Sequence, residues 1–369
     1  MEELVKEKST GDKVRNYLIV FFSLLLFIFA IDLLTVAMGR LNNDVARDII
    51  QATRNPFISL FVGLLVTALV QSSSTVTASI VAIVASGNMT LQQAVPMVLG
   101  ANIGTTLTST LVSFTFITKR KEFKRALSSG ISHDIFNILN VIILFPLELY
   151  FNFLSKTSEK LAKLFVSNEN VTENFEYNRI FTRGTTEWIV ENINIPFLST
   201  LVAIFLVFFS IKVMTTSVYK NFVLDTFQDI SKIIFKNSGV SFIYGIFFTA
   251  AVQSSTVTTC LVVPLVANRK VSLAKSFPFI IGANIGTTIT AVIASMYKTE
   301  AAIALAIAHV LFNFIGALIF LPFPEIRQIP IKLADFMGDT SVRNRFFGFA
   351  YILLTFFIIP FLLIYFSRE

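Results

Sequence analysis

The sequence predicts an all-α, multi-pass membrane protein built from two inverted-topology repeats, each with a re-entrant helical hairpin. The first observation is composition: 54% of the residues are hydrophobic and 14% are charged, whereas ordinary globular domains carry about 25% charged residues. The second is a series of apolar stretches of about 20 residues, the length that crosses a bilayer as a helix. The third is a polar motif that recurs at a fixed spacing, which indicates an internal duplication.

Seven stretches are long and apolar enough to be full membrane spans. The first is longer than the apolar core of a signal peptide and lacks a small-residue cleavage site, so we interpret it as a retained span. The predicted spans are 17–38, 91–117, 128–154, 196–216, 272–297, 300–321 and 346–367.

Two further apolar stretches, 56–87 and 238–268, are interrupted near their middle by polar clusters. The clusters read Gln71-Ser72-Ser73-Ser74-Thr75 and Gln253-Ser254-Ser255-Thr256. The apolar arm before each cluster has only 15 residues. At about 1.5 Å per residue such an arm falls short of the roughly 30 Å hydrocarbon core. We therefore predict that each stretch enters and leaves the membrane on the same side.

The basic residues give the orientation. With the N-terminus inside, 20 of the 30 Lys and Arg residues fall on the cytoplasmic side, as the positive-inside rule requires. We expect a cell-membrane protein with a cytoplasmic N-terminus, surrounded by lipid. The charge of +7 then needs no nucleic-acid partner. The single cysteine, Cys260, excludes an intrachain disulfide.

Self-similarity defines the organisation of the chain. The segment 100–106, Gly-Ala-Asn-Ile-Gly-Thr-Thr, recurs at 282–288, each time 29 residues after the glutamine of a polar cluster. His133 and Asn137 are echoed by His309 and Asn313. The first unit holds three full spans, so the second begins on the opposite face. The predicted parts are repeat 1 (17–154, hairpin 56–87), an external loop (155–195), repeat 2 (196–321, hairpin 238–268) and a final transmembrane helix (346–367).

The two polar clusters have the chemistry of an anion and sodium site. Hydroxyls and amides can donate to an anion and coordinate Na⁺ through other lone pairs. Opposed hairpins would also bring two helix N-termini together near the midplane. Neither hairpin contains Lys or Arg, so a buried dianion would need co-bound Na⁺ for compensation. The alternative is a structural role, with Ser and Thr bonding back to the helix or packing against a neighbour.

The recurring glycine segments have two compatible interpretations. A broken helix would expose carbonyls that suit Na⁺, whereas the Gly-x-x-x-Gly spacing is also typical of close helix packing. Asp32, Asp134 and Glu148 are intramembrane acids and hence functional candidates. For the two histidines we expect structural hydrogen bonding more than proton transfer.

These motifs, with His133-Asp-Ile-Phe-Asn137 and Phe145-Pro-Leu-Glu148, resemble the type II sodium-dependent inorganic phosphate cotransporter family. The second cluster departs from the family's Gln-Ser-Ser-Ser only by Thr256, which keeps the hydroxyl. The resemblance implies a symporter, not an enzyme, that imports HPO₄²⁻ with Na⁺ as coupling ion and no other cofactor, and it leaves a homodimer open. It implies phosphate contacts from Gln71, Ser72, Ser73, Asn102, Gln253, Ser254, Ser255 and Asn284. It implies sodium contacts from Gln253, Ser254, Thr287, Thr288 and Thr290, with a mirror site at Thr105, Thr106 and Thr108.

Three alternatives remain beside this interpretation. Sulfate or another oxyanion could replace phosphate, although HPO₄²⁻ carries a donor that neutral acceptors can select. A channel would show flux independent of a sodium gradient, and a scaffold would show no flux. A hydrolase with a serine nucleophile would need a nearby base, and neither hairpin contains His, Asp or Glu.

Overall fold

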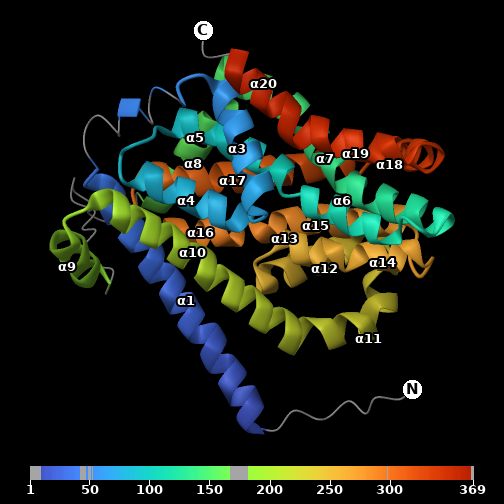
Figure 1. Cartoon of the computed structure of the whole chain (residues 1–369), viewed down its shortest axis with the longest axis horizontal. Helices are drawn as coiled ribbons and strands as arrows, with labels where there is room; N and C mark the ends of the chain where they lie inside the picture. Colours follow the sequence, from blue (N-terminus) through green and yellow to red (C-terminus); the bar gives the residue numbers. More distant parts are fainter. Residues whose placement is uncertain are drawn as a thin grey trace.

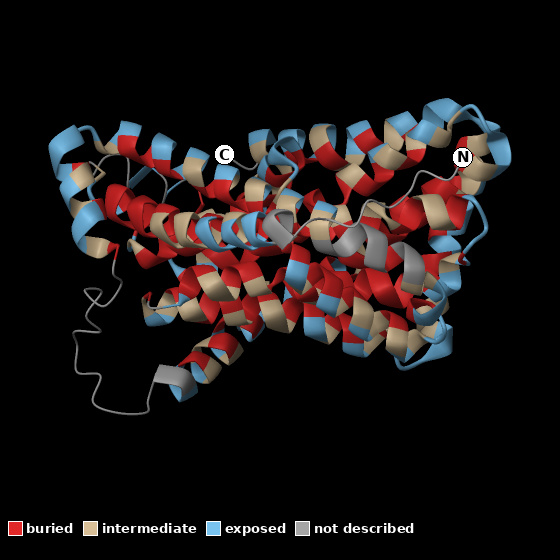
Figure 2. Cartoon of the chain, turned by 90° about the horizontal axis from the view of Figure 1, so that it is seen from below, coloured by how far each residue is buried: buried red, intermediate tan, exposed pale blue. Residues whose placement is uncertain are grey.

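The computed structural model describes residues 10–41, 47–48, 51, 53–166, 182–296 and 298–366. Every regular element in this part of the chain is a helix. Most helices lie side by side in one body, and the pair α1 (Thr10–Gly39) and α10 (Pro196–Val218) extends obliquely from it (Figure 1). Buried residues gather in the interior and exposed residues at the outer turns (Figure 2).

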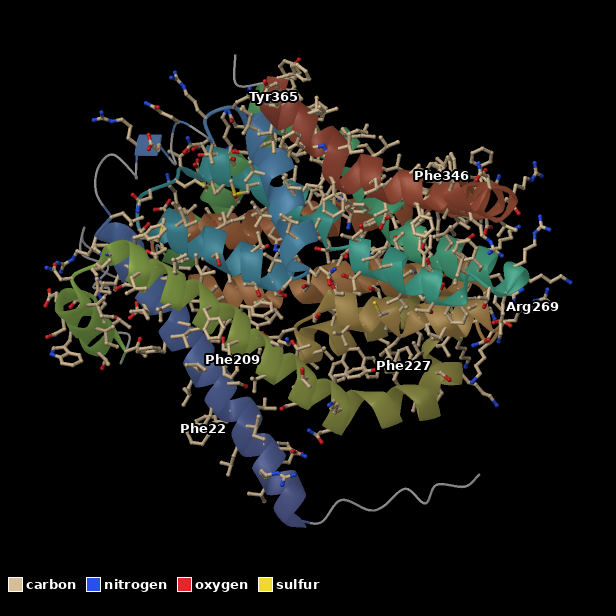
Figure 3. The ribbon with its side chains drawn as sticks, in the orientation of Figure 1. Phe22, Phe209, Phe227, Arg269, Phe346 and Tyr365 are labelled. Atoms are coloured by element: carbon tan, nitrogen blue, oxygen red, sulfur yellow. The ribbon has the colours of Figure 1, made fainter. Side chains whose placement is uncertain are left out.

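Within the described residues, seven helical segments are long and apolar enough to cross a membrane. Large aromatic side chains such as Phe22 and Phe209 project outward from the oblique pair (Figure 3), as expected for surfaces that face lipid. The all-α, multi-pass class is therefore confirmed. The segments are Val14–Gly39, Leu91–Phe116, Arg120–Phe151, Pro196–Asn221, Leu273–Ser295, Glu300–Phe320 and Arg345–Phe366.

The first interrupted stretch forms two helices, α3 (Pro56–Val70) and α4 (Ser73–Ala85). Asn55 starts α3 because its Oδ1 accepts the N–H of Phe57 at 2.9 Å, and the proline at the first position needs no hydrogen-bond partner there. The helix ends at Gln71, whose φ of 55° and ψ of 30° are left-handed. This conformation reverses the chain at the polar cluster.

The second interrupted stretch repeats this design. Asn237 starts α12 (Ser238–Val252) by accepting the N–H of Val240 at 2.8 Å. Gln253 ends the helix with the same φ of 55° and ψ of 30°, and α13 (Ser255–Cys260) and α14 (Val262–Ala267) follow. Both sets of helices, α3 with α4 and α12 with α13 and α14, fit the predicted hairpin ranges. Their re-entrant course in a bilayer and the inverted relation of the repeats stay predictions.

Each glycine segment ends a helix that is then interrupted. α5 (Leu91–Gly104) is followed after Thr105 and Thr106 by α6 (Leu107–Ser113). α15 (Leu273–Thr287) is followed after Thr288 by α16 (Ile289–Ser295). Thr105, Thr106 and Thr288 keep right-handed helical dihedrals, so each interruption is local and the chain continues in the same span. The exposure of carbonyl groups to Na⁺ at these positions stays a prediction.

The close packing is extreme at the glycines. A Cβ on Gly100 would lie 1.8 Å from the carbonyl oxygen of Leu60 in α3. A Cβ on Gly282 would lie 2.1 Å from the carbonyl oxygen of Phe242 in α12. Only glycine lets these backbones touch, so each hairpin's first helix is held against the broken helix of its own repeat.

The second arm of each hairpin contacts the other repeat. α4 packs against α16, and α13 packs against α6. The two polar clusters therefore lie where a helix start from one repeat meets the short helix after the break of the other. These two contacts between the repeats place the candidate site at the boundary of the two repeats.

The remaining elements surround this centre. The predicted loop 155–195 contains most of α8 and all of α9, and its residues 167–181 lie outside the described part of the chain. α8 packs along α17, and α18 packs along α7. These elements are α7 (Arg120–Phe151), α8 (Phe153–Val166), α9 (Arg183–Ile193), α11 (Leu224–Ile234), α17 (Glu300–Phe320), α18 (Pro324–Arg343), α19 (Arg345–Leu353) and α20 (Ile359–Phe366), with short 3₁₀ or π turns at Phe114–Phe116, Tyr219–Val223 and Leu354–Ile358.

Candidate functional site

The two hairpin tips have the same local design. After each left-handed glutamine, a serine in extended conformation begins the next helix. Ser72 Oγ accepts the N–H of Thr75, and Ser254 Oγ accepts the N–H of Val257, both at 3.3 Å. These hydroxyls therefore cap their own helices. The serines that follow them, Ser73 and Ser255, are not used for capping.

The first tip reaches into the second repeat through Ser74. Its Oγ donates to the carbonyl oxygen of Gln253 at 2.9 Å. The same Oγ lies 3.4 Å from Thr287 Oγ1 and 3.5 Å from Thr290 Oγ1. Four neutral oxygens from three segments of the chain thus lie close together at one buried point. Neutral oxygens of this kind are suitable ligands for a hard cation.

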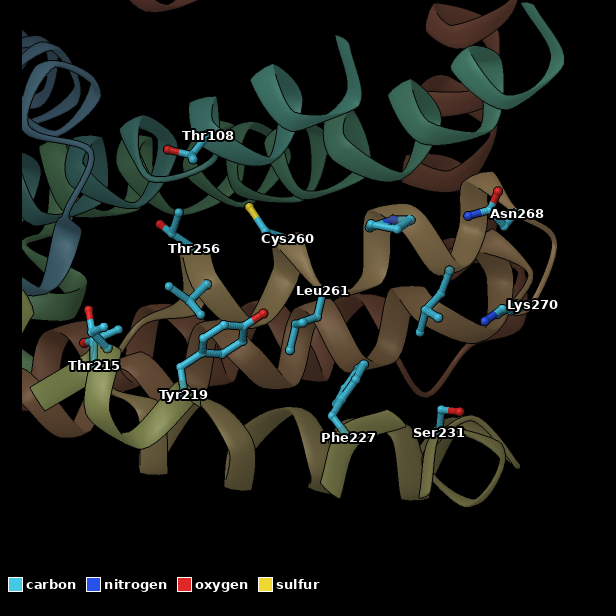
Figure 4. A pocket seen from close by; sticks show the side chains of 14 residues that line it. Thr108, Thr215, Tyr219, Phe227, Ser231, Thr256, Cys260, Leu261, Asn268 and Lys270 are labelled. Atoms are coloured by element: carbon cyan, nitrogen blue, oxygen red, sulfur yellow. The ribbon is translucent and has the colours of Figure 1, made fainter. Parts of the chain in front are cut away.

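The equivalent of Ser74 at the second tip does not make the equivalent contact. Thr256 corresponds to Ser74, but the described residues include no bond between Thr256 and Gln71. Instead, Thr256 and Thr108 line a cavity of about 880 Å³. Figure 4 shows them at one end of it and Asn268 and Lys270 at the other. The two tips are therefore in different states, one closed by protein contacts and one adjoining a large cavity with a mixed polar and apolar lining.

Several polar atoms at the second tip have no protein partner. Gln253 Oε1, Ser255 Oγ and Thr108 Oγ1 are buried without a hydrogen bond among the described residues. An unsatisfied buried polar group costs about 1–3 kcal/mol. A polar ligand at this tip would provide partners for such atoms.

A crossed hydrogen-bond network joins the repeats behind the tips. His133 Nε2 donates to Asn284 Oδ1 at 2.5 Å, and Asn284 Nδ2 donates to Asn137 Oδ1 at 2.8 Å. Reciprocally, His309 Nε2 donates to Asn102 Oδ1 at 3.3 Å. Each histidine thus bonds the asparagine of the other repeat. These contacts agree with a structural role, and the preference for this role over proton transfer stays a prediction.

Asn102 has further partners in both repeats. Asn313 Nδ2 also donates to its Oδ1 at 3.3 Å, and Asn137 Nδ2 donates to its backbone oxygen at 2.8 Å. The amide oxygens of Asn102 and Asn284 are therefore occupied by protein donors. In this conformation the side chains of both residues therefore join the two repeats.

The structure brings together part of the predicted residue set. Gln253, Thr287 and Thr290 lie around Ser74, which belongs to the first polar cluster. Nothing in the sequence indicated that Ser74 contacts the other repeat. Thr288 Oγ1 donates to Ile285 within its own helix. Thr105 and Thr106 likewise donate to Ala101 and Ile103. The remaining members of the predicted phosphate set, Gln71 and Ser73, lie at the first tip, where Gln71 is exposed and Ser73 is buried.

Two of the intramembrane acids have structural partners away from the tips. Asp134 Oδ2 accepts the hydroxyl of Thr110 at 3.0 Å and that of Tyr351 at 3.2 Å. Glu148 Oε2 accepts the N–H of Leu154 at 2.7 Å and that of Ser155 at 3.2 Å at the start of α8. The first links α7 to α6 and α19, and the second stabilises a helix N-terminus.

The third acid, Asp32, forms a buried ion pair. Its Oδ1 lies 2.9 Å from Lys298 Nζ, and its Oδ2 accepts the hydroxyls of Thr182 and Thr186. Arg183 NH1 lies 3.9 Å from the same carboxylate. Burial lowers the pKa of Lys298, and the neighbouring Asp32 opposes that shift. The pair ties α1 to α9 and to the turn between α16 and α17.

Comparison with known proteins gives consistent matches. A family model described as Na⁺/Pi-cotransporter matches residues 26–164 and 206–330. Sodium-dependent phosphate transport protein 2A of Rattus norvegicus is 28% identical over 434 residues, covering 96% of this chain and 68% of the relative. Protein 2B of Homo sapiens is 25% identical over 433 residues, covering 90% and 62%. The chain spans about two thirds of the length of these relatives. No solved structure matches the chain.

The matched ranges contain both hairpin tips, both broken helices and both histidines of the crossed network. The names of these relatives describe sodium-dependent phosphate transport. This similarity supports Na⁺-coupled phosphate cotransport, and the seven apolar helices agree with a membrane location. The chain is a transporter, not an enzyme, and it belongs to the Na⁺/Pi-cotransporter family.

Proposed function

We propose that this protein is a secondary active symporter of the cell membrane that imports inorganic phosphate on the inward sodium gradient. The observation that carries the proposed site is the oxygen cluster of Ser74, Gln253, Thr287 and Thr290 between the repeats. We assign this cluster to Na⁺. Helix motion of either repeat would change its geometry, so ion binding would depend on conformation.

We assign phosphate to the space between the two tips. The donors there are neutral: the amides of Gln71 and Gln253, the hydroxyls of Ser73 and Ser255, and the first N–H groups of α4. Ser72 and Ser254 hold the helix starts, and Asn102 and Asn284 hold the broken helices behind them. The amide and hydroxyl oxygens there can also accept a hydrogen bond. They can discriminate HPO₄²⁻ from sulfate because only HPO₄²⁻ has an O–H to donate to them.

Coupling follows from charge. Moving an uncompensated dianion out of water costs many kcal/mol, and neither tip supplies a cationic side chain. A sodium ion beside the tips lowers that cost. By thermodynamic reciprocity phosphate then raises the affinity for Na⁺ to the same extent.

The cavity beside the second tip suggests the direction of release. It runs from Thr108 and Thr256 to Lys270, which is cationic. With the N-terminus in the cytoplasm and the hairpins re-entrant, Lys270 lies on the cytoplasmic side. The structure then corresponds to a conformation open to the inside. The inverted repeats would produce the outward-open conformation by exchanging the states of the two tips.

The test is uptake of radiolabelled phosphate into proteoliposomes, with an inward Na⁺ gradient compared with the same K⁺ gradient. We expect accumulation only with Na⁺. Labelled sulfate under the Na⁺ gradient tests the alternative substrate. Equal uptake under both cations would contradict symport, and folded Gln253→Ala protein with the uptake of the parent would contradict the assigned site.

A further inference from the structure

A second cavity, lined by both apolar and polar side chains, lies outside the hairpin tips. It occupies about 270 Å³ where the first turns of α7, the end of α14, the start of α15 and one face of α18 meet. Arg125, Ser128, Arg269, Ser272 and Asp335 are its polar lining residues. Arg269 lies at one end of the body (Figure 3).

Arg125 in α7 and Arg269 after α14 line the same cavity. Arg125 Nε donates to the carbonyl oxygen of Ala267 at 2.7 Å, which orients the guanidinium and leaves its terminal NH₂ groups for another acceptor. Arg269 has a left-handed φ of 60° just after α14. Asp335 supplies one carboxylate, yet neither arginine lies within 4.0 Å of it in an ion pair. The charged lining residues therefore carry a net charge of +1.

The cavity also contains a buried hydroxyl without a partner. Ser128 is 1% exposed, and its Oγ makes no hydrogen bond within the described chain. The 15-residue helix α15 begins at the same place, and the side chain of its N-cap residue, Ser272, makes no capping hydrogen bond. The first N–H groups of α15 and the positive end of its dipole thus remain open to a ligand.

We propose that this cavity binds a phosphate group, either free inorganic phosphate or the phosphomonoester headgroup of a lipid. Two guanidinium groups, a hydroxyl donor and a helix N-terminus form a donor set that matches a tetrahedral oxyanion, because guanidinium groups bind such oxygens in pairs. A bound phosphate group would join α14 to α7 and α15. It would thereby restrain the second hairpin, at a distance from the transport site.

The test uses the full chain in phosphatidylcholine nanodiscs with K⁺ in place of Na⁺, which weakens phosphate binding at the sodium-coupled tips. Thermal unfolding is followed as inorganic phosphate rises at constant ionic strength. A second series adds phosphatidic acid to the nanodiscs instead. The variants are Arg125→Gln with Arg269→Gln, and Ser128→Ala. Lys275→Gln with Lys332→Gln is the control, since it removes the same charge from exposed positions that do not line the cavity.

We expect the Tm of the parent and the control to rise with the ligand, because a ligand that binds the native state stabilises it. The double arginine variant should need at least tenfold more ligand for the same rise. A response to inorganic phosphate identifies a free-anion site, and a response to phosphatidic acid alone identifies a lipid site. No rise with either probe, or an equal rise in parent and arginine variant, overturns the proposal. If the arginine variant does not fold, an unchanged response in Ser128→Ala overturns it.

Discussion

Removing the Ser74 hydroxyl should weaken sodium activation of transport. Ser74→Ala deletes one oxygen of the proposed Na⁺ cluster, which now lies 2.9 Å from the Gln253 carbonyl and 3.4 and 3.5 Å from the hydroxyls of Thr287 and Thr290. An interaction between a neutral polar group and a charge contributes about 1.5–3 kcal/mol. At about 1.4 kcal/mol per factor of ten, the Na⁺ concentration for half-maximal uptake should rise roughly tenfold to a hundredfold.

The assay is initial phosphate uptake into proteoliposomes over a series of Na⁺ concentrations. Ser79→Ala is the matched control, because Ser79 lies on the same helix and donates only to the carbonyl of Thr75 in the turn before it. Thermal unfolding of both variants separates a binding defect from a folding defect. An unchanged half-maximal concentration in Ser74→Ala, or an equal change in Ser79→Ala, would refute the assignment of Ser74 to Na⁺.

Three further changes test other parts of the structure. Gly100→Ala should lower the Tm strongly, because the new Cβ would lie 1.8 Å from the carbonyl oxygen of Leu60 in the facing helix. Gly39→Ala is the control, because its Cβ meets no atom within 4 Å. Equal Tm values for the two variants would contradict the close packing. Cys260, the single thiol in the sequence, lines the large cavity but is only partly accessible. A maleimide should therefore label it slowly, because burial disfavours the reactive thiolate. Modification should block uptake, and phosphate with Na⁺ should slow labelling further; labelling at the same rate with and without phosphate and Na⁺ would contradict this. Asp32→Asn leaves the buried Lys298 without its carboxylate and should cost about 3–5 kcal/mol. This loss of stability should shrink as pH rises from neutral through the lowered pKa of Lys298. The reason is that the folded state holds the Lys298 proton less tightly than the unfolded state does. A Tm difference between Asp32→Asn and the parent that stays constant with pH would contradict this prediction.

The helices and their breaks were predictable because their causes are local. Asn55 and Asn237 cap helices of 15 residues that end at a glutamine, and apolar runs of fixed length predict spans. The glycine pattern likewise predicted a close helix pair. These features depend on neighbours along the chain, so a single sequence was sufficient to predict them.

The cross-repeat contacts were not predictable in the same way. Ser74 follows two serines with similar chemistry, and only the packing of α4 on α16 decides that its hydroxyl reaches Thr290. Asn102 and Asn284 were predicted near phosphate, but the histidines of the opposite repeat occupy their amide oxygens. Contacts between residues more than 150 positions apart depend on tertiary structure that a motif does not encode.

The crossed histidine–asparagine network has a consequence for how this molecule can be assembled. Asn102 of the first repeat needs His309 and Asn313 of the second, and Asn284 of the second needs His133 and Asn137 of the first. Either half made alone would leave these amides, which lie between the repeats, without the partners that they have in the whole chain. We therefore expect that neither half reaches its native structure alone. A split protein should regain its native structure only when both fragments are synthesised together, and an ancestor with one repeat would have required a second copy of itself.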